Sequence, residues 1–441
     1  MVANVVKMKE TAIVWYRNDL RVQDHQSLYL ASCNHQKVIA YYTFDPAHYQ
    51  TTSWGFKKTE KYRAQFLIET VDALRTELEA LNITLVIGQK SPQEELPGLI
   101  KKWDVATIYL QKEWTSEEQN TLREVQKNCD ESVVFSEHYD QFLFHPDDIP
   151  FEIEQLPEVF TQFRKQCEAK TSVRPLILKA QCMPKENVLS ERYSTPSLND
   201  LGLEASSQDS RTAFPFEGGT QAGKQRMQYY GWESNKLSFY KKTRNGLLGK
   251  DYSSKYSTWL ANGSLSPRMI YWDLMDYERN VEKNQSTYWL FFELAWRDYF
   301  KFISLKHQDR IFYLGGIKGR DYDWKNDSQL VNQWIQGQTS EPFVNANMLE
   351  LNHTGWMSNR GRQNVASYLT KEMQVDWRIG AAYFEAMLLD YDVHSNYGNW
   401  MYVAGVGNDP RDRKFNIALQ SQRYDAQGAY QKKWLQTTLF S

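Results

Sequence analysis

Charged and aromatic side chains crowd one apolar, helix-forming stretch near the end of this 441-residue chain. Between Thr354 and Tyr402, Arg362, Asp390 and Asp392 stand among leucines, valines and tryptophans. A buried charge without a partner costs several kcal/mol. These residues therefore need one another or a bound cofactor, although acids two apart in LLDYDVHSN are also ordinary turn residues. A metal site is the weaker interpretation, because no third carboxylate or histidine cluster joins them.

A hydroxyl-rich segment precedes another helical stretch. Ser253, Ser254 and Ser257 surround Lys255, and the chain turns helical near Trp259. Hydroxyl and ammonium donors next to a helix N-terminus suit a diphosphate. Serines in front of a helix are more often plain N-caps, so the residue types alone leave both interpretations open.

A third group of residues lies in STYWLFFELAWRDYFKF, residues 286–302. Three-residue spacing places Glu293 and Trp296 near one face of a helix, with Arg297 beside them. Core packing explains the apolar residues of this run, but an acid among them needs a partner. Elsewhere, Asn396 is either a turn former or an amide that faces a ligand.

The motifs YSSKYSTWLANGSLSPR, GRQNVASYL and DYDVHSNYGNWMY resemble those of the photolyase and cryptochrome family and look most like its cryptochrome DASH branch. The resemblance covers nearly the whole chain and implies a bound FAD. It places a pair of Arg362 and Asp390 beside the isoalloxazine and the amide of Asn396 opposite flavin N5. The implied FAD contacts are Tyr240, Ser253, Ser254, Lys255, Tyr256, Ser257, Arg362, Asp390, Asp392 and Asn396.

The resemblance also implies an electron path. Trp400, Trp377 and Trp324 match the tryptophans that carry electrons from the protein surface to the light-excited flavin of photolyases. Each stands in its matching context, YGNWM, QVDWR and DWKND. The flanking motifs decide this choice, because the chain has 15 tryptophans.

On the substrate side, Glu293 matches the acid that hydrogen-bonds a pyrimidine dimer, and Trp296 matches the indole that stacks on it. Gln363 and Tyr402 stand where photolyases of duplex DNA usually have Met and Trp, so single-stranded DNA is the expected substrate. The implied DNA contacts are Arg244, Glu293, Trp296, Arg297, Asn359, Gln363, Tyr402 and Gln420.

The resemblance thus predicts a photolyase-type enzyme that uses FAD and blue light to split cyclobutane pyrimidine dimers, preferentially in single-stranded DNA. Glu293 would stabilise the dimer, Asn396 would tune the flavin, and the three tryptophans would reduce it. The alternative is a blue-light photoreceptor or DNA-binding transcriptional regulator with little repair. No long tail of the kind found in signalling cryptochromes follows YQKKWL, which favours repair.

A second chromophore is also implied. Glu69 matches a folate-contacting acid of DASH proteins, which makes 5,10-methenyltetrahydrofolate the candidate antenna. Ser53 departs from the pattern, because relatives carry a histidine there. Asn345 and Leu290 also depart from it, standing where the family usually shows an aspartate and a flavin-side tryptophan.

Two regions must position these residues. Five β-branched runs alternate with amphipathic helices, which predicts a five-stranded parallel, Rossmann-like α/β sheet over residues 1–140. The runs lie near Ile13, Val38, Leu85, Ile108 and Val133. This sheet lacks the dinucleotide fingerprint, because no glycine occurs before Gly55. A proline-containing connection over 141–215 then leads to an all-α FAD-binding region over 216–441.

Composition limits the partners and the compartment. The formal charge is −2 and the pI about 6.5, so DNA binding must be local, for example at the basic stretch from Lys241 to Arg268. Four scattered cysteines form no zinc pattern and favour a reducing compartment. The sequence shows no secretory signal and no long apolar run, so we expect a cytoplasmic protein that binds no membrane. We also expect a monomer.

Overall fold

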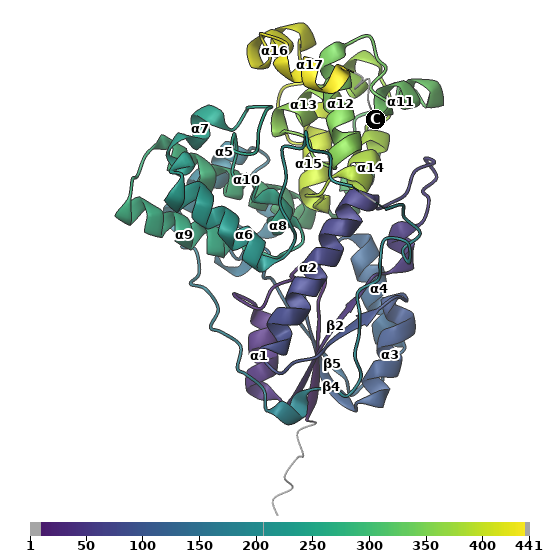
Figure 1. Ribbon diagram of the computed structural model, residues 1–441, viewed down its shortest axis with the longest axis vertical. Coiled ribbons are helices and arrows are strands. Elements are labelled where there is room, and N and C mark those ends of the chain that lie inside the picture. The colour runs from purple at the N-terminus through teal and green to yellow at the C-terminus, as the bar shows by residue number, and fades with distance from the viewer. Residues whose placement is uncertain (1–9, 206, 437–441) are drawn as a thin grey trace, which may run out of the picture.

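A computed structural model describes residues 10–205 and 207–436. An α/β domain lies at one end of the molecule and a larger helical domain at the other (Figure 1). The long helix α2 (Lys61–Glu79) runs from the sheet toward the helical domain. In the part of the chain that is described, no helix is both long and apolar enough to cross a membrane.

Five parallel strands form one sheet in the order β3-β2-β1-β4-β5, which confirms the predicted α/β class. The strands are β1 (Thr11–Trp15), β2 (Lys37–Thr43), β3 (Leu85–Gly88), β4 (Val105–Gln111) and β5 (Val134–His138). The central strands are buried on both faces, as in parallel sheets generally, because helices cover both sides.

Two helices cover each face of the sheet. Helix α1 (Gln26–Asn34) and α2 pack on one face, and α3 (Pro92–Lys102) and α4 (Ser116–Lys127) pack on the other. Apolar residues spaced at the helical period of 3.6 explain why α2 packs on the sheet. Val71, Leu74 and Leu78 are all buried in that contact.

The helical domain is built around α10, the longest helix of the described chain. Asn284 starts it with a capping box, accepting hydrogen bonds from the backbone of Ser286 and Thr287. The helices are α6 (Thr220–Met227), α7 (Tyr240–Thr243), α8 (Ser257–Ala261), α9 (Pro267–Asn280), α10 (Gln285–His307), α11 (Ser328–Ile335), α12 (Pro342–Thr354), α13 (Asn359–Ser367), α14 (Trp377–Met387), α15 (Val393–Ala404), α16 (Ile417–Tyr424) and α17 (Ala429–Leu435). Gln228–Glu233 and Tyr368–Glu372 are π-helical extensions of α6 and α13.

The connection between the domains is not wholly irregular. Helix α5 (Phe160–Lys170) buries Phe160, Phe163 and Cys167 in the same core as α10. Further along, Asn187 exchanges hydrogen bonds of 2.8 and 2.9 Å with the backbone of Val38 in β2. The chain therefore passes back over the α/β domain before α6 begins.

Candidate functional site

A cavity of about 560 Å³ lies in the helical domain among residues of α8, α10, α13 and α15. Its wall brings together predicted cofactor and DNA residues that are far apart in the sequence. These are Tyr240, Arg244, Ser253, Ser254, Lys255, Tyr256, Ser257, Glu293, Trp296, Arg297, Asn359, Arg362, Gln363, Asp390, Asp392 and Tyr402.

A buried arginine shapes the hydroxyl-rich loop in this wall. Arg226 of α6 donates to the backbone oxygens of Ser253 and Ser254, both at 3.0 Å. It also donates to the Asp251 carboxylate at 2.8 Å and to the backbone oxygen of Lys250 at 3.1 Å. The following helix α8 has only five residues. Its dipole is therefore weak, and the loop and its side chains must supply most anion contacts.

The ammonium group of Lys255 is buried in the cavity wall without a hydrogen-bond acceptor among the described residues. Its Nζ lies 3.4 Å from the ring centre of Tyr252 and 4.4 Å from that of Trp356. Burial holds the pKa of Lys255 well below its usual range, and Glu350 opposes this shift only in part. Lys255 also has a φ of 67°, which non-glycine residues rarely adopt. A strained, buried cation of this kind suits an anionic ligand.

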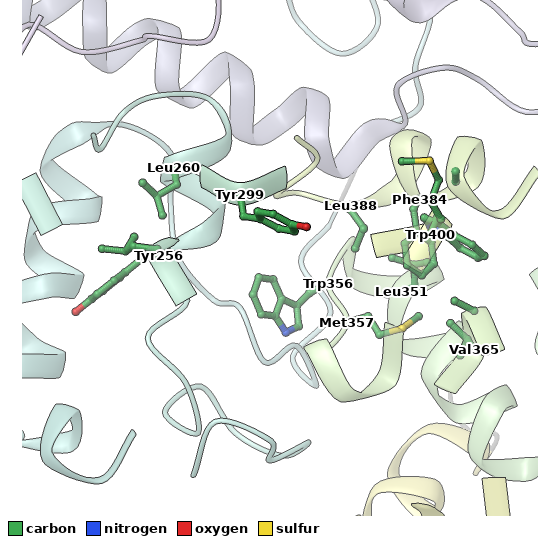
Figure 2. Packing of buried hydrophobic residues seen from close by; sticks show 14 of the residues in the cluster. Tyr256, Leu260, Tyr299, Leu351, Trp356, Met357, Val365, Phe384, Leu388 and Trp400 are labelled. Carbon is green, nitrogen blue, oxygen red and sulfur yellow. The ribbon is translucent and has the colours of Figure 1, made fainter. Parts of the chain in front are cut away.

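Arg362 and Asp390 form the expected ion pair. The Arg362 Nη2 lies 2.9 Å from the Asp390 Oδ1, and Arg362 Nε donates to the Met357 backbone oxygen at 2.9 Å. In the view of Figure 2, Trp356 and Met357 stand between Tyr256 and Leu260 on one side and Trp400 on the other. Both residues line the cavity, and their opposite charges compensate each other, as burial of an ion pair requires.

Asp392 caps the N-terminus of α15. Its Oδ1 accepts from the Ser395 backbone N–H at 2.8 Å, and its Oδ2 accepts from Lys301 Nζ at 2.7 Å. Burial alone would raise the pKa of Asp392, but Lys301 and the other nearby positive groups hold it well below the usual range. The helix that this carboxylate starts carries Asn396 and Trp400.

Asn396 is buried in α15 but does not line the cavity. Its Nδ2 donates to the Ala381 backbone oxygen of α14 at 2.9 Å. This bond makes Asn396 a helix-to-helix contact and fixes the direction of its amide oxygen.

The innermost of the three predicted tryptophans is Trp400, which is 2% exposed. Its ring lies edge-on to Phe384 at 5.0 Å and to Trp334 at 6.2 Å between centroids. The ring also packs on Gly380, where an added Cβ would come within 2.2 Å of it. Gly380 belongs to α14, and Trp377 lies one turn before it on that helix. Helix α14 therefore carries one predicted indole and packs against another.

The outermost tryptophan, Trp324, reaches this pair through a backbone bridge. Its neighbour Lys325 pairs with Val375, two residues before Trp377. Trp377 is fully buried and donates its indole N–H to the Leu314 backbone oxygen at 2.9 Å, whereas Trp324 is half-buried. Two of the three predicted indoles are thus buried, on α14 and α15, and the third is half-buried beside the chain that leads into α14.

The acid predicted on the substrate side is paired within the cavity. Glu293 lies 2.5 Å from Arg244. Burial raises the pKa of Glu293, and Arg244 partly counteracts this rise.

The two aromatic residues predicted to face the substrate are in contact. Trp296 lies edge-on to Tyr402 with centroids 6.0 Å apart. Phe160 of α5 stacks on Trp296 at 3.7 Å. One face of this indole is therefore covered by the connection between the domains, which the sequence did not indicate.

Two predicted DNA residues differ from the rest, one by its contacts and one by its place. Arg297 donates to the backbone oxygens of Gln141 at 2.6 Å and Leu260 at 3.2 Å, so its guanidinium ties the helical domain to the connection. Gln420 lies on α16 and does not line the cavity.

A second cavity, of about 540 Å³, lies between the α/β domain and the helical domain. It includes Glu113, Lys301 and His394, which sequence reasoning missed. Glu69, the predicted antenna residue, does not line it and instead accepts a hydrogen bond from the Gly218 backbone at 2.9 Å. Both cavities are lined by Ala261, Arg297 and Asp392, so only a thin wall separates the two cavities.

Sequence reasoning also missed Arg226 and Glu350 in the first cavity's surroundings. Glu350 of α12 accepts from the Tyr430 hydroxyl of α17 at 2.7 Å, and burial raises its pKa to about 7. A lone arginine and a lone acid on separate helices carry no spacing signal, although a charged residue in an apolar run is a weak hint. Among the described residues, no group of three or more His, Cys, Asp or Glu is placed to hold a metal ion.

Comparison with known proteins agrees with this arrangement. A family model described as the FAD binding domain of DNA photolyase matches residues 289–438, and one described as DNA photolyase matches residues 12–185. Cryptochrome DASH of Gloeobacter violaceus is 47% identical over 97% of this chain and 85% of that protein. Cryptochrome DASH of Danio rerio is 44% identical over 96% of this chain and 83% of that protein.

The fold also resembles that of solved structures. A crystal structure of a Synechocystis cryptochrome matches with a TM-score of 0.92 and 43% identity, covering 97% of this chain and 88% of that one. A bacterial class III photolyase from Agrobacterium tumefaciens shares the fold with a TM-score of 0.82. With its sheet, its helical FAD-binding domain and these relatives, the chain belongs to the photolyase and cryptochrome family, in the cryptochrome DASH branch.

Proposed function

We propose that this chain binds FAD and uses blue light to split cyclobutane pyrimidine dimers, preferentially in single-stranded DNA. The observation that carries the proposal is that one cavity holds both sets of predicted residues. Lys255, Arg362 and Asp390 line it together with Glu293 and Tyr402. A cofactor and a pyrimidine dimer docked in the same cavity lie within reach of electron transfer.

The residues present fit FAD. Lys255 supplies an unpaired buried cation for the diphosphate, and Ser253 and Ser254 supply hydroxyls on a loop that Arg226 holds in place. Asp390 is paired with Arg362 and offers acceptor oxygens to ring N–H groups. When bound, reduced and excited by light, FAD supplies the electron that opens the cyclobutane ring.

The protein's own groups then act on the substrate and on the supply of electrons. Glu293 hydrogen-bonds the dimer and can donate a proton to it, because burial raises the pKa of Glu293. Trp324, Trp377 and Trp400 pass electrons inward to restore the reduced cofactor. Arg244 neutralises a phosphate or the acid beside it, depending on whether DNA is bound.

The preference for single strands follows from the polar character of the cavity mouth. Gln363 and Tyr402 line the cavity together with Asn359. Polar groups bind an extruded pyrimidine dimer less strongly than large apolar side chains do. Less binding free energy is then available to offset the cost of unstacking the dimer from a duplex. We further propose that the chain acts as a monomer and that the second cavity, with Glu113 in its wall, takes an antenna such as methenyltetrahydrofolate.

The test is a repair assay. Reduced, FAD-loaded protein is illuminated with an oligonucleotide containing one cyclobutane dimer, offered single-stranded, in a loop and in a duplex. We expect dimer loss that is fastest in the single strand. Glu293→Gln should slow repair with little change in DNA binding, and a dark sample is the control. No dimer loss in the single-stranded and looped DNA would refute the proposal.

A light-signalling role on the same scaffold is the second candidate. It is favoured by Trp324, whose half-buried indole brings the electron path to the surface, where a partner can sense the redox state. Deleting the gene and measuring ultraviolet survival and light-dependent transcription separately distinguishes the two roles. Loss of survival alone supports repair, and loss of the transcriptional response alone supports signalling.

A further inference from the structure

A tyrosine lies against the outermost tryptophan of the electron path. The ring centre of Tyr322 is 5.5 Å from that of Trp324, with the planes at 67°. The Tyr322 hydroxyl donates to the Asp412 Oδ2 at 3.2 Å. We propose that Tyr322 is the terminal electron donor of this path and that Asp412 accepts its proton. The inference rests on the proposed electron path through Trp324.

Trp324 is poorly equipped to keep the oxidising equivalent. Its indole N–H is covered, and no described residue accepts a hydrogen bond from it. An oxidised indole that cannot release its proton stays a cation and remains a strong oxidant. Trp377 differs, because its N–H already donates to the Leu314 backbone oxygen. The Trp400 N–H also lacks a described acceptor, but its ring neighbours are Trp334 and Phe384. The outermost indole lies against a tyrosine and is therefore the one that can draw an electron from a phenol.

Tyr322 has the proton acceptor that Trp324 lacks. An oxidised phenol is a strong acid, and the 3.2 Å contact with Asp412 is within reach for proton transfer. Two cations adjoin the same hydroxyl and ring. Arg320 Nη1 lies 3.3 Å from the hydroxyl, and Lys371 Nζ lies 5.2 Å from the ring centre. Positive neighbours disfavour a positively charged phenol, so the electron and the proton leave together.

The Trp324 radical cation gains one electron from Tyr322 and returns to the neutral indole. Tyr322 gives its phenolic proton to the Asp412 carboxylate and becomes a neutral radical. Lys371, whose Nζ lies 2.5 Å from Asp412 Oδ1, holds that carboxylate in place. A thiolate reductant from solution then gives one electron to the half-buried Tyr322 and becomes a thiyl radical, while Asp412 returns its proton and the phenol is restored.

This step would make the separated charge last longer. The neutral Tyr322 radical can become a phenol again only when Asp412 returns the proton. Return of the electron from Trp324 to Tyr322 is therefore slowed. Photoreduction without a fast external donor then depends on Tyr322. Tyr397 is the natural competitor, because its ring lies 6.0 Å from that of Trp377.

Transient absorption and paramagnetic resonance of the FAD-loaded, oxidised protein after a light flash test the inference. We expect a tyrosyl radical to follow the tryptophanyl radical in the wild type. In Tyr322→Phe the tyrosyl signal should disappear, the tryptophanyl radical should persist, and the photoreduction yield should fall several-fold. Tyr397→Phe is the matched control and should retain the tyrosyl signal.

Asp412→Asn provides the second variant. It leaves the ring contact but removes the proton acceptor, so the tyrosyl radical should form more slowly and with a larger solvent deuterium effect. Identical radical kinetics in the wild type and Tyr322→Phe, with normal tryptophanyl radicals in both, would overturn the inference but not the tryptophan path. If the wild type forms no tryptophanyl radical, the path itself fails and this inference falls with it.

Discussion

At the scale of single residues, Lys255 is the buried, unpaired amine in the wall of the cavity of the helical domain. Its ammonium group contacts the faces of Tyr252 and Trp356, and no described acceptor neutralises it. A desolvated cation–π contact contributes about 2 kcal/mol, which is less than the several kcal/mol needed to desolvate an ammonium group. The loop therefore holds a desolvated amine whose protonated form a diphosphate would stabilise.

Replacing this lysine tests that argument. Lys255→Met keeps much of the apolar stem and removes the charge, so we expect FAD to bind about tenfold to a hundredfold more weakly, where each tenfold is about 1.4 kcal/mol. Fluorescence titration of the protein with FAD measures this change. Lys250→Met, at an exposed lysine of the same loop, is the control and should bind normally. Wild-type affinity in Lys255→Met would place the diphosphate elsewhere.

At the scale of elements, one buried ion pair starts the helix that carries two proposed functional residues. Lys301 of α10 holds Asp392, and Asp392 caps α15 through Ser395. Both side chains of the pair are almost completely buried. The positions of Asn396 and Trp400 therefore depend on a contact made outside their own helix.

Removing the cation should disturb that helix. In Lys301→Met the Asp392 carboxylate is left buried and unpaired, which destabilises a protein by about 3 to 5 kcal/mol. Urea unfolding measures this loss, and the visible circular dichroism of bound flavin reports the tilt of α15. Lys306→Met, further along the same helix and paired with the half-exposed Glu158, should lose about 1 kcal/mol or less. Equal losses in both variants would remove the special role of Lys301.

The sequence predicted the elements well and the contacts between them only in part. β-branched runs indicate buried strands and a period of 3.6 residues indicates the buried face of a helix, so the five strands, α2 and α10 could be anticipated. Local motifs also placed Lys255 and Asp390 in one cavity wall. The roles of Arg226, Glu350 and Phe160 could not be anticipated, because each depends on a partner from a distant helix or loop that local spacing does not encode.

At the scale of the whole molecule, the cavity between the domains makes stability depend on pH. Burial raises the pKa of Glu113 to about 7, against an ordinary value of 4.5. The folded protein therefore keeps this proton where the unfolded chain has released it. The stabilisation is full below about pH 4.5 and is lost as the pH rises through 7.

Glu113→Gln removes this dependence while keeping an oxygen that can accept from Gln111. The variant should gain stability relative to the wild type between pH 5 and 8, by at most about 3 kcal/mol, since one pKa unit is about 1.4 kcal/mol. Urea unfolding at both pH values, without added folate, measures the change. A constant difference between the two proteins would show that Glu113 does not titrate in this range.

The joint between the domains is itself a buried charge cluster, and its removal should affect both domains at once. Arg268 of α9 lies 3.0 Å from Asp24 and 3.2 Å from Asp140, and all three side chains are 3% exposed or less. Arg268→Met leaves two buried carboxylates without their cation, so we expect a loss of about 3 to 5 kcal/mol. Arg279→Met, at an exposed pair with Asp276 on the same helix, should change stability by about 0.5 kcal/mol or less. Unfolding followed by far-ultraviolet dichroism and by flavin release should show both transitions moving together, because the cluster touches the sheet domain and the helical domain. A shift in flavin release alone would mean that the domains unfold independently and that this cluster does not couple them.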